Sequence, residues 1–213
     1  MISKKENIRC ECQYSDDLQH RFTLKRIWNK DKPLACVITI HPNTSDNIHM
    51  DMTTFLTING IVNLEEFGGV ILVNLFSVIT NKLHMRWARD VDVNHPENDI
   101  YIQKAAEESS IVLLAYGKGV MNNIRIVNRI NQVLTLLSKY QDKLMVISDG
   151  ERSFLHPLTP STRSVVWKLV PFSHEEHIIL TKNRKKAVDE TLIPEENANQ
   201  EATAEEAKES VPT

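Results

Sequence analysis

Between about residue 21 and residue 150, short apolar runs alternate with stretches in which apolar residues recur every three or four positions. The short runs are rich in branched aliphatic residues and end at polar residues or glycine, which is typical of buried strands. The longer stretches have the spacing of amphipathic helices. The expected helices are 51–62, 98–108 and 122–140, and the expected strands are RFTLKRIW (21–28), LACVITI (34–40), VILVNLF (70–76), IVLLAYG (111–117) and LMVIS (144–148).

Strands that alternate with helices predict βαβ units. We therefore expect an α/β fold with a largely parallel central sheet and helices on both faces. A chain of 213 residues, 41% of them hydrophobic, is long enough to bury one sizeable core. The expected organisation is an N-terminal extension (1–20), one α/β domain (21–186) and a C-terminal tail (187–213).

Charge is unevenly distributed along the chain. Residues 187–213 carry eight acidic residues against one lysine and no aromatic residue, so we expect a disordered acidic tail. Without this tail, the net charge changes from −3 to 24 − 20 = +4. A mildly basic body is compatible with nucleic acid as a partner but does not establish it. The role of the tail is left open.

Several classes of protein are disfavoured by the composition. There is no run of eighteen or more apolar residues and no apolar segment near the start, so we expect neither a membrane span nor secretion. Three cysteines, two of them in a Cys-x-Cys pair, fit a reducing compartment, and we expect a cytoplasmic protein. No motif indicates a cofactor, and no cysteine has further ligands at zinc-site spacing, so no metal site is expected.

Polar residues follow the apolar runs at the places where a parallel sheet binds ligands, beyond the carboxyl ends of its strands. The sequence HPNTSD follows the run 34–40, and Asn74 lies near the end of the run 70–76. Lys118 follows the run 111–117, and His156-Pro-Leu follows the last run. Residues far apart in the sequence are therefore expected to meet at one edge of the sheet.

These motifs, in this order, resemble the uracil-DNA glycosylase superfamily. GGVILVNLFSVITNKLHMR (68–86) is similar to the strand that delivers a uracil-reading asparagine, and HPL (156–158) to the His-Pro-Ser or His-Pro-Leu motif. ITIHPNTSD is similar to the first motif, a strand that leads into Asp-Pro or Asn-Pro. Over roughly 20–170, the order of motifs is closer still to a bacterial family of domains of unknown function with Asn-Pro-Ser-Thr in the first motif, which is His-Pro-Asn-Thr here.

The resemblance implies a glycosylase-like fold and assigns roles to individual residues. Asn74 would pair with the N3–H and O4 of an extruded uracil, because an amide offers both a donor and an acceptor. Phe55 would supply the stacking face. His156 would stabilise the negative charge that develops on the departing base. The loop 158–163 would face DNA, and the candidate DNA-binding residues are Leu158, Ser161, Arg163 and Lys118.

The chain departs from the superfamily at the first motif, where the residue before proline positions the attacking water. His41 occupies that place, and Asn43 is the alternative. Three functions remain open: a glycosylase-like protein that binds DNA or an extruded pyrimidine with weak or lost activity, an active glycosylase for uracil or a modified pyrimidine, and an enzyme that binds small nucleotides through Gly117-Lys118-Gly119. Partners under the first two are single- or double-stranded DNA and an acidic protein that mimics DNA.

Each of these residues also has a purely structural interpretation. Asn74 is explained by a turn at the end of a strand, and the two histidines by ordinary loop positions. Phe55 is of a type found more often in a core than on a stacking platform. Asp51 has the position of a helix N-cap. The sequence does not decide between these interpretations and the functional ones.

Overall fold

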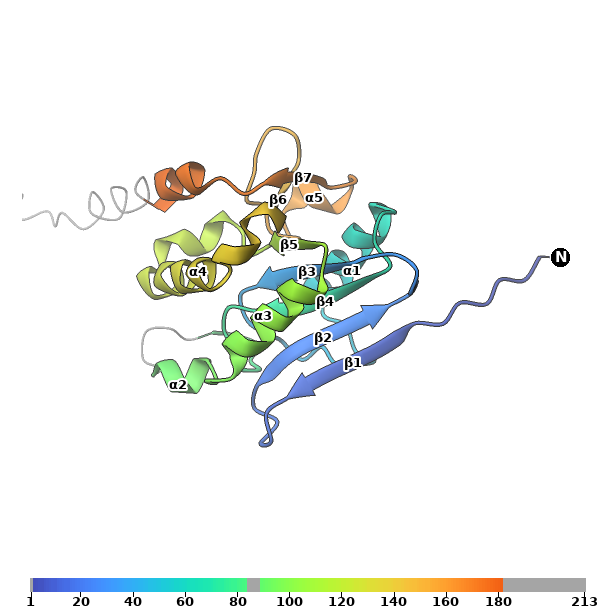
Figure 1. Cartoon of the computed structure of the whole chain (residues 1–213), viewed down its shortest axis with the longest axis horizontal. Coiled ribbons are helices and arrows are strands. Elements are labelled where there is room, and N and C mark those ends of the chain that lie inside the picture. Colours follow the sequence, from blue (N-terminus) through green and yellow to red (C-terminus); the bar gives the residue numbers. More distant parts are fainter. Residues whose placement is uncertain (1, 84–88, 182–213) are drawn as a thin grey trace, which may run out of the picture.

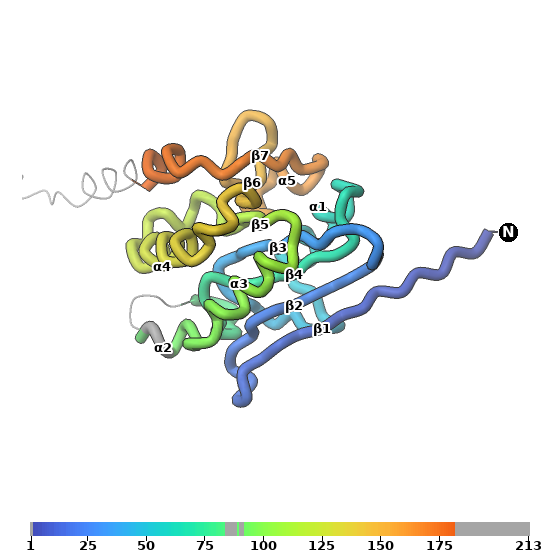
Figure 2. Tube along the Cα trace, viewed as in Figure 1, coloured from blue at the N-terminus to red at the C-terminus, as the bar shows by residue number. Residues whose placement is uncertain are grey.

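The computed structural model describes residues 2–83 and 89–181; the predicted acidic tail lies outside the described residues. Seven strands in the described residues form one sheet in the order β1-β2-β4-β3-β5-β6-β7 (Figure 1). Figure 2 shows the chain running from β1 at one edge of the sheet to the residues after β7 at the other. The strands are β1 (Arg9–Tyr14), β2 (Arg21–Ile27), β3 (Leu34–Thr39), β4 (Gly69–Asn74), β5 (Ile111–Leu114), β6 (Leu144–Ser148) and β7 (Lys168–Pro171).

The central four strands are parallel, and the outer three are antiparallel to their neighbours. The expected largely parallel sheet is therefore confirmed only for β4, β3, β5 and β6. A parallel crossover needs about a dozen residues. Only residues 28–33 connect β2 to β3, which is too short for a parallel crossover, so β2 and β3 run in opposite directions. β4 lies between them in the sheet, and β2 pairs antiparallel with β4.

Helices cover both faces of the sheet, as expected. Each face of the sheet carries its own hydrophobic core, and successive residues of the central strands point to opposite faces. In β3, Cys36 and Ile38 belong to one core, while Ala35 and Val37 belong to the other. The first core includes side chains of α3 and α4, and the second includes Ile61 of α1. The helices are α1 (Met52–Asn63), α2 (Asp90–Val93), α3 (Asn98–Glu108), α4 (Ile124–Leu136) and α5 (Pro160–Arg163), with 3₁₀ turns η1 (Lys118–Asn122) and η2 (Ser138–Lys143).

Three local differences from the expected elements have simple physical causes. Residues 9–14, inside the expected N-terminal extension, form the edge strand β1, in which Cys10, Cys12 and Tyr14 alternate with polar residues. β7 is only four residues long, too short for a periodic signal. The helix expected over 122–140 ends at Leu136, and the chain continues as the 3₁₀ turn η2.

Candidate functional site

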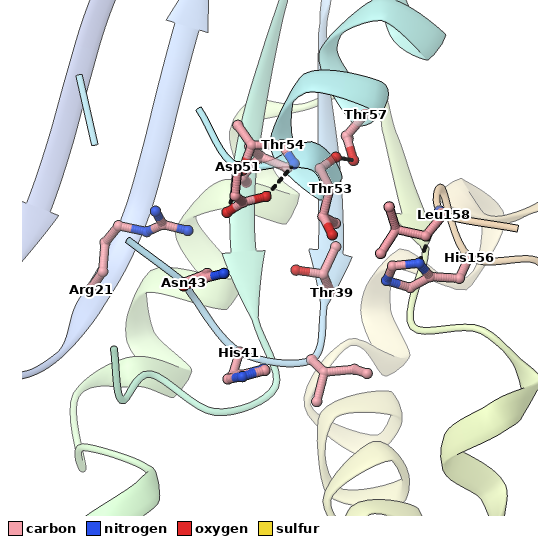
Figure 3. Close-up of a pocket in the computed structure, with 12 residues that line it drawn as sticks. Arg21, Thr39, His41, Asn43, Asp51, Thr53, Thr54, Thr57, His156 and Leu158 are labelled. Carbon is pink, nitrogen blue, oxygen red and sulfur yellow. Dashed lines mark hydrogen bonds between the residues drawn. The ribbon is translucent and has the colours of Figure 1, made fainter. Parts of the chain in front are cut away.

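A cavity of about 280 Å³ lies at the carboxyl ends of β3 and β4 (Figure 3). From β3 the chain crosses to β4 on one side through α1 and then returns to β5 on the other side, so the direction of winding switches beside β3. This is the place where open α/β sheets bind ligands. The lining residues are Arg21, Thr39, Ile40, His41, Asn43, Asp51, Thr53, Thr54, Thr57, Leu72, His156 and Leu158.

Asn74 does not line this cavity itself, but its side chain is bonded to a residue that does. Asn74 and Thr39 are register partners at the ends of β4 and β3, and Asn74 Nδ2 donates to Thr39 Oγ1 at 2.5 Å. Asn74 is 2% exposed, and its Oδ1 is buried with no hydrogen-bond partner among the described residues. A buried acceptor without a partner is unfavourable, so a ligand donor that reached Oδ1 would be stabilised by bonding to it.

His156 also lines the cavity, and its surroundings favour the neutral ring with the proton on Nε2. Its Nδ1 accepts a hydrogen bond from the Leu158 backbone N–H at 3.0 Å, which leaves the proton on Nε2. Burial lowers the pKa of His156 below its ordinary value of 6.5, so the ring is neutral at pH 7. His156 is therefore a neutral donor held in place by the loop that follows it.

Gly117 packs directly against His156. Its backbone has φ +74°, and a Cβ at this position would lie 2.7 Å from His156 Cβ. The chain from β5 and the loop after β6 therefore approach more closely than any other residue would allow. The predicted Gly-Lys-Gly segment thus packs against the His156 loop, and it leads into the 3₁₀ turn η1 rather than a full helix N-terminus.

Both first-motif candidates line the cavity, but their side chains are engaged differently. His41 Nε2 is buried and has no hydrogen-bond partner in the described structure. Burial and, next, the positive charge of Arg21 lower the pKa of His41, so this ring is also neutral at pH 7. Asn43 Oδ1 accepts from the Thr44 backbone N–H at 2.8 Å and so holds a local turn. Of the two, His41 has the unsatisfied nitrogen.

Phe55, the predicted stacking residue, is not brought into the cavity. Asp51 caps α1 by accepting from the Thr54 backbone N–H at 2.8 Å, which confirms its structural interpretation and fixes the rotation of the first turn. Thr54 and Thr57 consequently face inward, while Phe55 points outward and is 44% exposed. The threonines line the cavity where an aromatic ring was expected.

Arg21 is a charged lining residue that the sequence did not single out. It is the first residue of β2, is 3% exposed, and donates from Nη1 to the Ser45 carbonyl. Arg26, five residues further along β2, donates to the carbonyls of Asp46 and Asn47 at 3.1 and 3.2 Å. Two buried arginines on one strand therefore hold the loop that follows the first motif.

A second cavity, of about 590 Å³, shares Ile40, His156 and Leu158 with the first. Lys118 and Arg152 contribute to its lining. The two hollows are therefore adjacent across the His156 loop. The structure thus places Lys118 and Leu158, two of the predicted DNA-binding residues, beside the site.

The other two predicted DNA-binding residues are engaged in bonds within the protein. Ser161 Oγ donates to Asp149 Oδ2 at 2.7 Å. Arg163 is exposed and donates from Nε and Nη2 to the Leu158 carbonyl at 2.9 and 2.6 Å. These bonds shape the loop 158–163 and leave its surface open to solvent.

The described residues show neither a metal-binding cluster nor a membrane helix. Across 2–83 and 89–181, no group of three or more His, Cys, Asp or Glu residues could hold a metal ion. No helix in the same ranges is both long and apolar enough to cross a bilayer.

The fold and the cavity define an α/β protein with a polar, ligand-sized hollow at the carboxyl edge of a mixed sheet. The chain belongs to the family described as "Protein of unknown function (DUF1643)", whose model matches residues 21–158. Every residue that lines the first cavity falls within that match, which begins at Arg21 and ends at Leu158. No curated protein and no solved structure matches the chain significantly.

Proposed function

We propose that this protein is a uracil-DNA glycosylase-like protein that binds DNA and takes an extruded pyrimidine base into the cavity. One observation carries the proposal: a neutral His156 with its proton on Nε2 lines the same cavity as Thr39, the partner of Asn74. A glycosylase-like site requires a group that reads the base and a donor that receives its developing charge. The site has a candidate for each role.

Asn74 is the candidate for reading the base. Its Nδ2 is tied to Thr39, so the side chain has a fixed orientation, and its Oδ1 lacks a partner. A uracil N3–H would satisfy that oxygen, whereas cytosine presents an acceptor at the same position. Two acceptors facing each other leave both unsatisfied, which disfavours cytosine by about 1–3 kcal/mol. A ligand must approach Asn74 past Thr39, the cavity residue bonded to it.

His156 is the candidate for stabilising charge on the base. A neutral imidazole with a fixed Nε2–H donates without carrying its own positive charge, as a preorganised dipole aimed at an oxygen. The lowered pKa of His156 keeps the ring in this form at neutral pH. Threonine hydroxyls from α1 supply further polar contacts around the ligand.

A second candidate function is hydrolysis of the glycosidic bond itself. It is favoured by His41, which stands at the first motif with an unsatisfied buried nitrogen at the cavity. A neutral histidine can accept a proton from water and position it for attack. If His41 does not position a water molecule, the protein binds the base but leaves the glycosidic bond intact.

DNA would lie over the two adjacent cavities, with Lys118 at the second one available to phosphates, while Arg152 beside it is paired with Asp149 at 2.7 Å. The same cationic edge suits an acidic protein that mimics DNA. The loop 158–163, whose shape is fixed by its internal bonds, would lie against the duplex.

The decisive experiment incubates purified protein with labelled oligonucleotides that contain uracil, both single- and double-stranded. Alkali then breaks the strand at any abasic site, and binding to the same oligonucleotides is measured in parallel. His156→Ala is the test variant, and Lys104→Ala on α3, an exposed lysine absent from both cavity linings, is the control. Strand breaks that are lost in His156→Ala establish hydrolysis. Binding without breaks establishes recognition alone, and neither binding nor breaks would refute the proposal.

A further inference from the structure

Arg21 is a buried cation that faces the cavity from the side opposite His156. Figure 3 shows the two side chains at opposite ends, with Asn43 and Thr39 between them. Arg21 is 3% exposed, and its Nε has no hydrogen-bond partner in the described part of the chain. Among the described residues, the bond from Nη1 to the Ser45 carbonyl is the only hydrogen bond of its side chain.

No carboxylate in the described part of the chain contacts the Arg21 guanidinium directly. Within residues 2–83 and 89–181, Arg21 forms no ion pair with a carboxylate. The acidic neighbours that act on it from further away are Asp51 and Asp46. The carboxylate of Asp51 is taken up by the α1 N-cap and by Ser45 Oγ at 2.6 Å, and that of Asp46 by the His49 ring at 3.0 Å.

Cys12 and Tyr14 on β1 also lie near Arg21, but they do not supply a negative charge. Burial raises the pKa of the Cys12 thiol, and it raises the pKa of the Tyr14 phenol to about 12. Both groups are therefore neutral at pH 7. A buried guanidinium without a contacting anion is unfavourable, so the folded protein retains Arg21 at a cost that a bound anion would offset.

A second unsatisfied group lies at the same end of the cavity. His41 Nε2 is buried without a partner, and Arg21 is close enough for its charge to lower the pKa of His41. The Asn43 side chain lies between Arg21 and Thr39, and Thr53 also lines the cavity. This end holds the Arg21 guanidinium and several donors beside the Asp51 carboxylate, which is already bonded to the α1 N-cap and to Ser45, whereas the His156 end carries no charged group.

We propose that the Arg21 end of the cavity is a phosphate subsite, so that the ligand is a nucleotide unit with its phosphate at Arg21 and its base toward Asn74 and His156. The planar guanidinium fork matches a phosphate group in shape and charge. The subsite rests on the buried arginine, and only the placement of the base rests on the proposed function. The phosphate belongs either to a free mononucleotide or to the backbone of DNA.

The test measures thermal unfolding in increasing sodium phosphate against sodium chloride of equal ionic strength, at pH 7.5. A ligand that binds only the folded state must raise Tm with concentration. The wild type, Arg21→Met and Arg26→Met are compared. Arg26 is a matched control, because it is also a buried arginine of β2 that binds the same loop, but it does not line the cavity.

The wild type and Arg26→Met are expected to gain stability in phosphate, and Arg21→Met to show at least about a tenfold weaker response. Arg21→Met is expected to fold, because an apolar side chain of similar size often replaces a buried unpaired charge without loss. If it does not fold, Arg21→Lys keeps the charge but loses the fork, and a weaker response is expected there too. Equal Tm in phosphate and chloride for the wild type, or an undiminished response in Arg21→Met, overturns the proposal.

Further ligands separate the two sources of phosphate and the two proposals. Uridine, uridine 5′-monophosphate and a short uracil-containing oligonucleotide are titrated into the wild type and Arg21→Met. Arg21-dependent binding of the monophosphate identifies a free nucleotide, and Arg21-dependent binding of the oligonucleotide alone identifies DNA backbone. Phosphate binding without any preference for a pyrimidine would sink the proposed function but keep the subsite. Binding of uracil-containing DNA that is unchanged in Arg21→Met would keep the proposed function but refute the phosphate subsite.

Discussion

Asn74 Nδ2 donates to Thr39 Oγ1 at 2.5 Å across the ends of two parallel strands. The two residues are register partners, and their side chains emerge on the same face of the sheet. The bond fixes the amide in one orientation and leaves Oδ1 buried without a partner. A second asparagine, Asn98 on α3, donates from Nδ2 to the Asn74 carbonyl at 3.1 Å and so holds the backbone at the same point.

Thr39→Val is expected to destabilise the protein and to weaken binding of uracil-containing DNA. Valine has nearly the shape of threonine but lacks the acceptor, so the Asn74 amide is left unsatisfied, which lowers the free energy of unfolding by about 1–3 kcal/mol. Thr39→Ser keeps the hydroxyl and is the matched control. Urea unfolding and DNA binding are measured for both; equal values for the two variants would show that the hydroxyl has no role.

Asn74→Asp is expected to weaken uracil recognition more than it weakens the fold. The carboxylate has no donor for Thr39 or for a base carbonyl, and it places a charge at a position that is 2% exposed. Asn74→Ala removes both base-reading groups and should abolish pyrimidine binding. Competition between uracil- and cytosine-containing oligonucleotides measures the change, and unaltered selectivity in both variants would exclude Asn74 as the reader.

Gly117→Ala is expected to displace His156 and to reduce binding at the site, whereas Gly119→Ala leaves both unchanged. A Cβ on Gly117 would lie 2.7 Å from His156 Cβ, and the backbone there has φ +74°, so the substitution is strained by about 1–3 kcal/mol. A Cβ on Gly119 meets nothing within 4 Å. Thermal unfolding and DNA binding of the pair test this, and equal behaviour would contradict the packing of Gly117 on the His156 loop.

Stability is expected to fall as pH drops below about 6.5. Burial lowers the pKa of four histidines in the folded protein, so the unfolded chain binds more protons between the folded values and 6.5. Stability is therefore full above 6.5 and decreases on acidification, by on the order of 1 kcal/mol toward pH 5. These histidines are His20, His41, His156 and His177.

Denaturant unfolding at a series of pH values from 7.5 to 5 measures this dependence. The double variant His41→Gln/His156→Gln should have a shallower slope, because glutamine does not titrate. Asp46 and Asp149 do not contribute in this range, since their hydrogen bonds hold the pKa of each carboxyl far below its usual value. A wild-type stability that rises on acidification from pH 7 to pH 5 would contradict the prediction.

Lys118→Ala is expected to weaken DNA binding equally for all sequences and to reduce its dependence on salt. Lys118 lines the second cavity, beside the His156 loop, and one lost phosphate contact lowers the slope of log affinity against log salt by about 0.9. Lys104→Ala provides the comparison, because Lys104 is an exposed lysine on α3 that lines neither cavity. Identical slopes for the two variants would remove Lys118 from the DNA surface.

The central strands, the main helices and the edge of the sheet that carries the polar residues could all be predicted from the sequence. The runs 34–40, 70–76, 111–117 and 144–148 became β3 to β6 within a few residues, because short branched aliphatic runs favour buried strands. His41, Asn43 and His156 reached one cavity because parallel strands end at one edge. Those outcomes depend on local pattern and chain order.

The three-dimensional packing was needed to show that Arg21 and the threonines of α1, and not Phe55, line the cavity beside the predicted residues. In the sequence, Arg21 is one of the polar residues that alternate with apolar residues along a strand. The pairing of β2 with β4 nevertheless places it in the same cavity as His156, which lies 135 positions later in the chain. The Asp51 cap turned Phe55 outward, and the Leu158 amide selected the tautomer of His156. The physical reason is that strand direction, helix rotation and ring orientation depend on contacts between distant residues, which no local pattern encodes.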